Sequence, residues 1–455
     1  MVSSKPKKSS EILDVTTGPT LKKSILFAIP IIISGVLQQA FNTADTIVVG
    51  RVSTEALGGV AATGSVTNLI INLFLGFSVG ASVVISQALG ADNEERAARC
   101  THTSILLSVI SGIIVAILGF FASEPALRLM GTPAENINYS IIYTKIFFLG
   151  APFMMVTNFA SAILRTTGDT KTPTLYLAIG GVVNVALNII FVMVLKMNPA
   201  AGVAVGTVIS NFISSILLIV KLTKADHCCK IVIKELRIYI NELRRIVSIG
   251  LPAGVQTSLF SASNLLMQSS INSFGHTFVE GNGACISIEL YCCFLYEGFV
   301  QAATTFAGQN FGAKKYDRIV KIYKECMFMG VGVFAFLSSV IIILLRRQLL
   351  GFFIVDSPEA IDVGSVRLMI VQGTYVIAAA MSITSAALKG IGKSFSSMLV
   401  VVFGICVFRI ICILTVFPRF RSIYMLYSLY PISWAISTIV LVIMFAYCMN
   451  KLKKG

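Results

Sequence analysis

The amino-acid sequence predicts an all-α membrane protein with twelve transmembrane helices in two homologous six-helix lobes. Three observations support this prediction: an apolar composition, twelve long apolar runs and an internal repeat. Of the 455 residues, 56% are hydrophobic and 13% are charged, and the mean hydropathy is +0.85. A soluble globular protein could not cover such a composition with a polar surface, so the lipid bilayer must be part of the solvent.

The apolar runs have the length and continuity of transmembrane helices. At about 20 residues for each span, a dozen spans with short loops use up the whole chain and leave no room for a large soluble domain. Strands of a membrane barrel would be shorter and would alternate in polarity, so helices are favoured. The runs lie near residues 24–49, 60–88, 101–122, 136–163, 172–195, 200–222, 246–272, 282–308, 321–345, 361–388, 394–416 and 422–448.

The basic residues indicate the orientation of the spans. The net charge is +15, but Lys and Arg form short clusters between apolar runs rather than one basic face, which argues against a nucleic-acid partner. Alternate loops hold most of them, so the positive-inside rule predicts a cell (inner) membrane protein with both termini cytoplasmic. The expected parts are an N-terminal tail (1–23) that is not a cleaved leader, an N-lobe (24–222), a linker (223–245), a C-lobe (246–448) and a C-terminal tail (449–455).

A polar stretch at 221–245 divides the runs six and six, and it suits either a charged linker or a short amphipathic helix at the membrane surface. The two halves resemble each other. SQALGADNEERA at 86–97 aligns with GQNFGAKKYDRI at 308–319 at an offset of 222 residues, which also pairs Asn42 with Asn264. Because six is even, the repeat is parallel, with its axis along the membrane normal. This arrangement is typical of transporters with a cavity between lobes.

The first span carries an acid and two other polar side chains on one face. Gln38, Asn42 and Asp45 are spaced i, i+4 and i+7, behind the kink expected at Pro30. An intramembrane acid is costly, so this face is expected to line a wet cavity. Alternatively, Asp45 lies at the membrane interface and caps the run near Gly50.

Polar side chains also lie in the fifth and sixth spans. Asn184 and Asn188 share one helical face, and Thr207 lies in the next span. Taken alone, these residues suit packing between helices. Together with Asp45 they supply carboxylate, amide and hydroxyl oxygens, the ligands that a small hard cation prefers.

The eighth span contains two further acids, Glu289 and Glu297. Either could titrate or attract cationic substrates, and either could equally be a buried structural group. Met154, several aromatic residues and Asn264 are further candidates for an adaptable substrate cavity, although lipid-facing packing explains the apolar ones as well.

Catalytic and metal-binding patterns are absent from the sequence. The three His are scattered, no phosphate-binding Gly-rich loop is present, and the ten Cys show no disulfide or metal-site spacing. We therefore expect no enzyme activity, no metal site and no cofactor. Transport would be driven by an ion gradient or run downhill.

The chain resembles the multidrug and toxic compound extrusion (MATE) family, in its bacterial DinF-like branch. The resemblance rests on IPIIISGVLQQAFNTADTIVVGRV, GASVVISQALGADNEERA, ILRTTGDTKTPT, NVALNIIF and EGFVQAATTFAGQNFGAKKYDR, in this order and spacing. It implies two lobes in a V, alternating access, and antiport of Na⁺ or H⁺ against organic, often cationic, drug-like compounds.

The resemblance also implies roles for individual residues. Pro30 would bend the first span, and Asp45 would be the acid of a cation site completed by Asn184, Asn188 and Thr207. Many relatives have Asp where this chain has Asn188, which leaves the choice between Na⁺ and H⁺ open.

The expected function is therefore secondary active antiport by a monomer in the bilayer, with small organic substrates and a monovalent cation as partners. Two alternatives remain. One is a flippase for lipid-linked glycans, which shares this architecture but tends to have a cavity lined with many cationic residues. The other is a channel or membrane scaffold, although no repeated selectivity element is visible.

Overall fold

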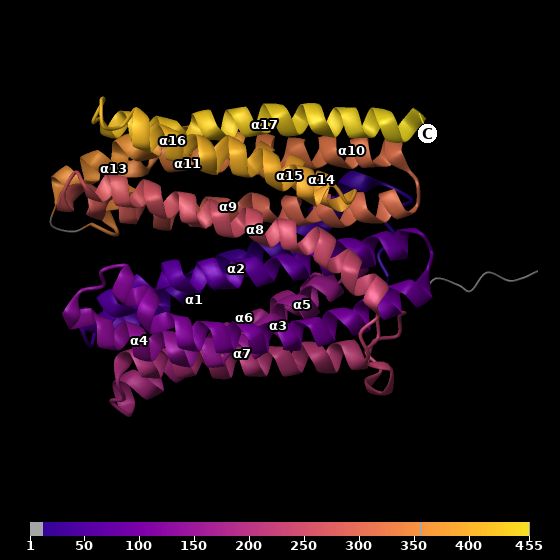
Figure 1. Cartoon of the computed structure of the whole chain (residues 1–455), viewed down its shortest axis with the longest axis horizontal. Helices are drawn as coiled ribbons and strands as arrows, with labels where there is room; N and C mark the ends of the chain where they lie inside the picture. The colour runs from indigo at the N-terminus through magenta and orange to yellow at the C-terminus, as the bar shows by residue number, and fades with distance from the viewer. Residues whose placement is uncertain (1–11, 355–356, 455) are drawn as a thin grey trace, which may run out of the picture.

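The computed structural model describes residues 12–354 and 357–454, and every regular element within these ranges is a helix. Figure 1 shows two bundles of helices, one from each half of the chain. The N-lobe contains α1 (Thr20–Gly50), α2 (Thr54–Gly90), α3 (Glu94–Leu129), α4 (Ala134–Leu149), α5 (Ala151–Thr167), α6 (Lys171–Asn188), η1 (Ile189–Val194) and α7 (Pro199–Thr223). The C-lobe contains α8 (Ile240–Asn272), α9 (His276–Gly312), α10 (Tyr316–Cys326), η3 (Met327–Ala335), α11 (Phe336–Leu344), α12 (Arg346–Gly351), α13 (Pro358–Ile370), η4 (Gln372–Thr374), α14 (Tyr375–Gly390), α15 (Ser394–Val401), η5 (Val402–Val407), α16 (Phe408–Thr415) and α17 (Ile423–Lys454).

The helices account for twelve membrane spans. In the described ranges, 11 continuous helical stretches are long and apolar enough to cross a membrane, and α4 and α5 form a further span bent by 51°. The bend falls at Gly150, after which Pro152 occupies the first turn of α5, where a proline disturbs no helical hydrogen bond. Each lobe has six spans, and the predicted fold class is confirmed.

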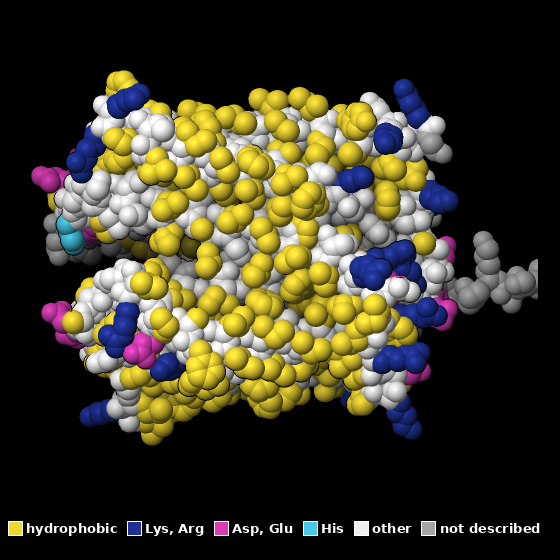
Figure 2. All heavy atoms as spheres, viewed as in Figure 1, with side chains coloured by type: hydrophobic (Ala, Val, Ile, Leu, Met, Phe, Trp, Pro, Cys, Tyr) yellow, Lys and Arg dark blue, Asp and Glu magenta, His cyan; other side chains and the backbone are white. Residues whose placement is uncertain are grey.

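The surface matches a bilayer. Figure 2 shows hydrophobic side chains over the middle of both lobes, with charged side chains gathered at the two ends. At one end, the view also shows a hollow between the lobes. We call this the open end, and the opposite end, where the last residues of α17 lie, the closed end.

Two glycines bring the lobes together at the closed end. A Cβ atom added to Gly90 would lie 1.8 Å from the carbonyl oxygen of Gln309, and one added to Gly312 would lie 2.0 Å from the carbonyl oxygen of Gln87. No other residue type fits at such distances without moving the backbone. Gly90 and Gln87 are the repeat partners of Gly312 and Gln309, so the contact is the same from both sides of a pseudo-two-fold axis.

The glutamine side chains repeat this symmetry. Nε2 of Gln87 donates to the carbonyl oxygen of Gly390 at 2.9 Å, and Nε2 of Gln309 donates to that of Thr166 at 3.1 Å. Thr166 and Gly390 are 224 residues apart, close to the repeat offset of 222, and they lie in two similar segments, LRTTGDTK at 164–171 and LKGIGKSF at 388–395. The sequence repeat is therefore also a structural repeat, and its two copies contact each other at the closed end.

Residues 12–19, the N-terminal strap, lie across the closed end. The backbone N–H of Leu13 donates to the carbonyl oxygen of Thr167 in the N-lobe at 2.8 Å. In the C-lobe, Nη2 of Arg318 donates to the carbonyl oxygen of Val15 at 3.0 Å. The strap thus connects the two lobes.

The segment between the lobes differs in detail from its predicted bounds. Helix α7 ends at Thr223, a 3₁₀ turn, η2, covers Ile233–Glu235, and α8 begins at Ile240, six residues before the expected start of the C-lobe at 246. Hydropathy marks only the apolar part of a span, while polar helix formers such as those of NELRR extend the helix beyond it. The amphipathic stretch is thus divided between a short turn and the first turns of α8.

Candidate functional site

A polar cluster in the N-lobe joins three spans. Nδ2 of Asn188 donates to Oδ1 of Asp45 at 2.6 Å. The side-chain amide of Asn184 can be placed in two orientations, and one of them gives both its nitrogen and its oxygen a hydrogen-bond partner. In that orientation the nitrogen donates to the same carboxylate at 2.8 and 3.2 Å, and the oxygen accepts from Oγ1 of Thr207 at 3.3 Å. The structure therefore brings together the four residues that the sequence suggested for a cation site.

The cluster directs two amide N–H groups at the carboxylate of Asp45 and leaves one amide oxygen unused. Asn188 is fully buried, and its Oδ1 has no hydrogen-bond partner. This oxygen faces α7 at Gly206, where an added Cβ would lie only 2.2 Å from it. Rotation of the Asn188 and Asn184 amides would turn their oxygens toward the carboxylate, and the three groups would then offer oxygen ligands to a small cation.

The helix that carries Asn188 changes its geometry at this residue. Helix α6 ends there and continues as the π-helix η1. π-helical turns are rare in proteins, and those that occur are often found at functional sites.

The other polar residues of the first span lie outside the cluster. Gln38 and Asn42 are exposed, while Asp45 is half-buried, and in the described residues neither amide side chain hydrogen-bonds to the cluster. Helix α1 continues through Pro30, whose carbonyl oxygen accepts a hydrogen bond from Oγ1 of Thr174 in α6 at 2.8 Å.

A cavity of about 490 Å³ lies between the lobes and is lined mostly by the C-lobe. Its walls include α2 and α5 of the N-lobe and α8, α9, α14 and α17 of the C-lobe. Four aromatic side chains line it: Phe260, Tyr296, Tyr375 and Trp434. Its volume suits a drug-sized molecule, and its walls combine aromatic and aliphatic side chains with about as many Ser, Thr, Asn, Gln and charged side chains.

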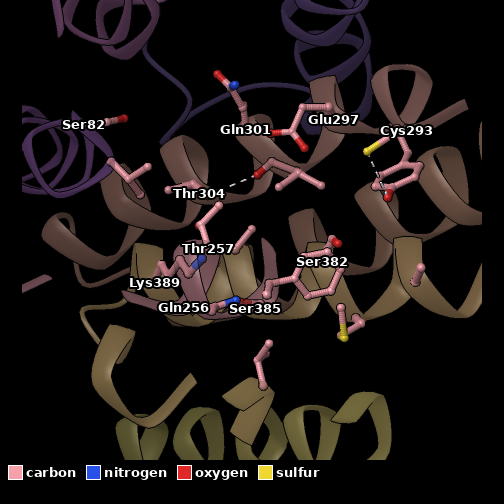
Figure 3. A pocket seen from close by; sticks show the side chains of 18 of the residues that line it. Ser82, Gln256, Thr257, Cys293, Glu297, Gln301, Thr304, Ser382, Ser385 and Lys389 are labelled. Atoms are coloured by element: carbon pink, nitrogen blue, oxygen red, sulfur yellow. Dashed lines mark hydrogen bonds between the residues drawn. The ribbon is translucent and has the colours of Figure 1, made fainter. Parts of the chain in front are cut away.

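Three charged residues line the cavity: Arg165, Glu297 and Lys389. Figure 3 shows Glu297 and Gln301 projecting from one wall, and Lys389, Gln256 and Ser385 on the opposite side. Nη1 of Arg165 donates to Oε1 of Gln301 at 2.9 Å. The other lining residues are uncharged, so two cations and one carboxylate leave the lining with one net positive charge.

The predicted cavity candidates separate in the structure. Glu297 lines the cavity, whereas Gln38, Asn42, Glu289, Asn264 and Met154 do not. Met154 packs with the apolar cluster of the N-lobe. Sequence analysis did not single out Arg165 and Lys389. Both lie in the last turn of a helix, and their side chains turn into the cavity. Their pairing in the internal repeat was the available signal.

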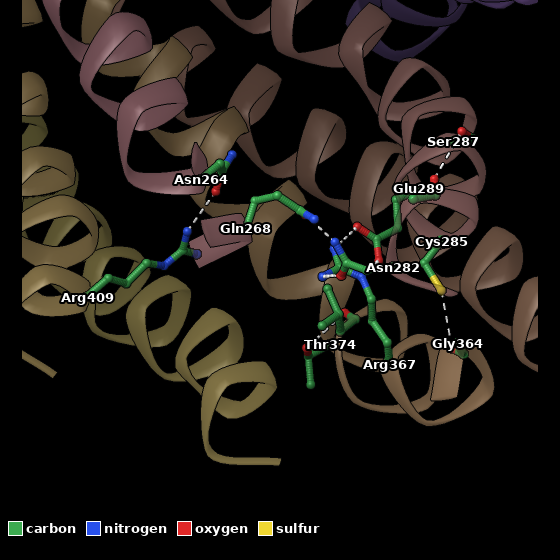
Figure 4. A network of polar contacts seen from close by, with 12 residues as sticks. Asn264, Gln268, Asn282, Cys285, Ser287, Glu289, Gly364, Arg367, Thr374 and Arg409 are labelled. Carbon is green, nitrogen blue, oxygen red and sulfur yellow. Dashed lines mark hydrogen bonds and ion pairs between the residues drawn. The ribbon is translucent and has the colours of Figure 1, made fainter. Parts of the chain in front are cut away.

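Glu289 belongs to a buried ion pair (Figure 4). Nε and Nη2 of Arg367 donate to its two carboxylate oxygens at 3.0 and 2.9 Å, and Nη1 donates to Oδ1 of Asn282 at 2.5 Å. The exposed fraction is 2% for Arg367 and 7% for Glu289. Each charge satisfies the other, which supports the structural interpretation of this acid.

A second buried arginine has no acidic partner in the part of the chain that is described. Nη1 of Arg409 donates to Oδ1 of Asn264 at 2.9 Å and Nε donates to Oγ of Ser433 at 3.0 Å, while its guanidinium lies 4.4 Å from the ring centroid of Tyr430. Its Nη2 is buried and unpaired. The predicted cavity residue Asn264 therefore holds this arginine in place (Figure 4).

Two repeated six-span lobes, a cavity between them and a polar cluster within one lobe define the class of the protein, a polytopic membrane transporter. Comparison with known proteins gives the family. The MatE family model matches residues 30–190 and 252–415, one match in each lobe, and the chain belongs to this family. The two matches begin 222 residues apart, which is the offset of the internal repeat.

Individual relatives agree with this assignment. The chain is 29% identical over 398 residues to the probable multidrug resistance protein YoeA of Bacillus subtilis, with 85% of each chain covered. It is 23% identical over 401 residues to the probable multidrug resistance protein NorM of Thermotoga maritima, covering 86% of this chain and 85% of the relative.

Solved structures show the same fold. One, described as the outward-facing conformation of a multidrug resistance MATE family transporter of the MOP superfamily, superposes with a TM-score of 0.91 at 23% identity, covering 99% of this chain and all of the other. A MOP superfamily transporter from Pyrococcus furiosus, described as having a binding pocket of reverse polarity, gives the same TM-score, identity and coverage. These neighbours are transporters and not enzymes.

Proposed function

We propose that the protein is a secondary antiporter that exports small organic compounds in exchange for Na⁺ or H⁺. The polar cluster around Asp45 carries this proposal, because it holds an acid and an unpaired buried amide oxygen within a membrane span. The relatives named as multidrug resistance proteins support export of organic molecules as the direction and cargo of transport.

The separation of the two sites suggests how exchange is coupled. The cation cluster lies between α1, α6 and α7, whereas the cavity lies between the lobes and contacts none of these helices. The two ligands therefore do not compete for the same atoms. Coupling has to pass through the shape of the N-lobe, with each ligand favouring a different arrangement of the lobes.

Helix α1 is the connection that the contacts indicate. It carries Asp45 near its open-end terminus and packs against α9, a cavity wall, at Gly298, where an added Cβ would lie 2.6 Å from the carbonyl oxygen of Ala28. Pro30 lies beside this contact and removes one helical N–H donor, which makes the helix easier to bend here. Cation binding at one end of α1 would thus act on the lobe interface at the other.

The topology completes the proposal. With both termini cytoplasmic, as the positive-inside rule predicts, the closed end faces the cytoplasm and the hollow faces outward. The state described here would then be the one that releases substrate to the outside and admits the cation.

The test is uptake of two fluorescent organic dyes, one cationic and one zwitterionic, into inverted vesicles, with a Na⁺ gradient and a pH gradient imposed separately. Uptake driven by one gradient identifies the coupling ion. In Asp45→Asn, the driven uptake should fall to the level of vesicles without the protein, because the amide cannot carry the negative charge. The matched control is Glu135→Gln, a change of an exposed acid at the start of α4 that should transport normally.

The outcomes separate the alternatives. Driven uptake by Asp45→Asn at the native rate would refute the cation site. Flux that does not saturate with substrate concentration, as the turnover of a carrier would, would indicate a channel. No flux of any compound would indicate a scaffold. Movement of lipid-linked glycans in place of either dye would favour the flippase.

A further inference from the structure

The two cations of the cavity are related by the internal repeat. Arg165 and Lys389 are 224 residues apart, and each occupies the last turn of its helix, α5 or α14. The residues that follow them, Thr166 and Gly390, accept the two hydrogen bonds that close the lobes. One cation from each lobe therefore reaches the cavity near the pseudo-two-fold axis.

The single acid of the cavity has no such counterpart. At the offset of 222, the partner of Glu297 is Leu75. Among the described residues, no ion pair within 4.0 Å joins Glu297 to Arg165 or Lys389, although all three interact electrostatically. The positive charges of the cavity are therefore not cancelled by direct pairing.

We propose that the cavity recognises organic anions and zwitterions, with Arg165 and Lys389 binding a carboxylate or phosphate group on an aromatic or apolar body. This inference rests on the proposed export function and specifies its substrate class. A purely cationic compound would meet two cations and one acid, whereas a carboxylate meets two opposite charges, which can form charge-assisted hydrogen bonds with it. In a zwitterion, the cationic group can lie at Glu297.

The shape of the cavity supports an aromatic body for such a ligand. The side chains of Phe260 and Trp434 line it, and the guanidinium of Arg409, which lies behind this wall, is 5.9 Å from the Phe260 ring centroid. This third cation has no acidic partner among the described residues, and it adds to the positive potential near the aromatic wall. A planar anionic compound can stack on the aromatic wall while its charged group reaches the closed end.

A structural interpretation of the two cations is available. Basic residues in the last turn of a helix are stabilised by the helix dipole, and Arg165 also binds Gln301. This role predicts no preference among ligands, so a binding measurement separates the two interpretations.

The experiment compares two probes that differ in one charge. A carboxy-rhodamine is a zwitterion, and its methyl ester is a cation with the same fluorophore. Binding of each to the purified full-length protein in uncharged detergent is followed by fluorescence polarisation. No ion gradient is needed, so a failure of the proposed ion coupling would not affect the result.

The expected preference follows from the charges. The native protein should bind the acid about ten-fold more tightly than the ester, since a charge-assisted hydrogen bond contributes about that factor. Lys389→Gln should remove most of this preference without weakening the ester, and Glu297→Gln should increase it. The matched control is Lys393→Gln, an exposed lysine of the same loop region that lies outside the cavity.

Equal affinity for acid and ester in the native protein would overturn the proposal, as would equal effects of Lys389→Gln and Lys393→Gln. Competition then identifies the source of the anionic group. Displacement of the acid by an anionic phospholipid added to the micelles indicates a lipid headgroup, and displacement only by a soluble aromatic carboxylate indicates a soluble compound. Either result supports the proposal if Lys389→Gln lowers the affinity of the protein for the competing compound.

Discussion

Removing the carboxylate of Glu289 should destabilise the C-lobe strongly. In Glu289→Gln, Arg367 loses its counterion and one of the two carboxylate hydrogen bonds of 3.0 and 2.9 Å, because an amide has a single accepting oxygen, and it keeps the bond to Asn282. The guanidinium would remain 2% exposed without a counterion. Breaking a buried ion pair from one side costs about 3–5 kcal/mol, because the remaining charge has no compensation.

The assay is thermal unfolding of the purified protein in detergent, followed with a thiol-reactive fluorogenic dye. All ten cysteines are free and six of them are buried, including Cys285 beside this ion pair, so unfolding exposes new thiols. The transition should move down by on the order of 5 °C. Asp362→Asn is the matched control: it breaks the exposed ion pair with Arg347 in the same lobe and should change the transition little.

A double variant tests the reasoning further. Glu289→Gln combined with Arg367→Met removes both charges, and stability should recover, because an apolar replacement of a buried ion pair is often close to neutral. An unchanged transition in Glu289→Gln together with loss of gradient-driven transport would refute the structural role. Glu289 would then have to act in coupling.

Two further predictions concern the closed end. Gly90→Ala should insert into the membrane normally but abolish transport in the vesicle assay. The added Cβ would lie 1.8 Å from the carbonyl oxygen of Gln309 and would keep the lobes apart. The control is Gly283→Ala, which has open space around it and should transport normally. Arg318→Gln should speed hydrogen exchange in residues 12–19, because it removes side-chain hydrogen bonds to two strap carbonyls; unchanged exchange there would show that the strap is held by its other contacts.

The fold was largely predictable because hydropathy and repeat are properties of the chain itself. Twelve apolar runs give twelve spans, and an even number of spans between repeats makes the axis parallel to the membrane normal. The exact reciprocity at Gly90 and Gly312 was also implicit in the aligned segments. The sequence did not predict which spans pack against each other at the closed end, because hydropathy carries no information about the neighbours of a helix.

The sites were predictable only in part. Asp45, Asn184, Asn188 and Thr207 could be found because polar side chains inside apolar runs are few and have to meet one another. By contrast, the role of Glu289 depends on Arg367, 78 residues further along the chain. Periodicity within one span cannot show such a partner.

The direction of side chains at helix ends was the second limit. The LRTTGDTK and LKGIGKSF segments place Arg165 and Lys389 where an apolar run meets a polar loop, and a long basic side chain at such a boundary usually extends toward water. Here both side chains line the cavity. The closure of the lobes at neighbouring residues decides this direction, and that is a tertiary contact.

The repeat also shows that equivalent positions need not carry equivalent chemistry. At the offset of 222, Asn42 corresponds to Asn264, and Arg409 falls between the partners of Asn184 and Asn188. The C-lobe thus fixes a guanidinium, bound to Asn264, in the region where the N-lobe holds the carboxylate of Asp45. A fixed positive charge repels a second cation, so this part of the C-lobe does not suit a cation site. The lobes therefore share a geometry but not the same charge at corresponding places: the N-lobe holds the carboxylate of Asp45, and the C-lobe holds the guanidinium of Arg409.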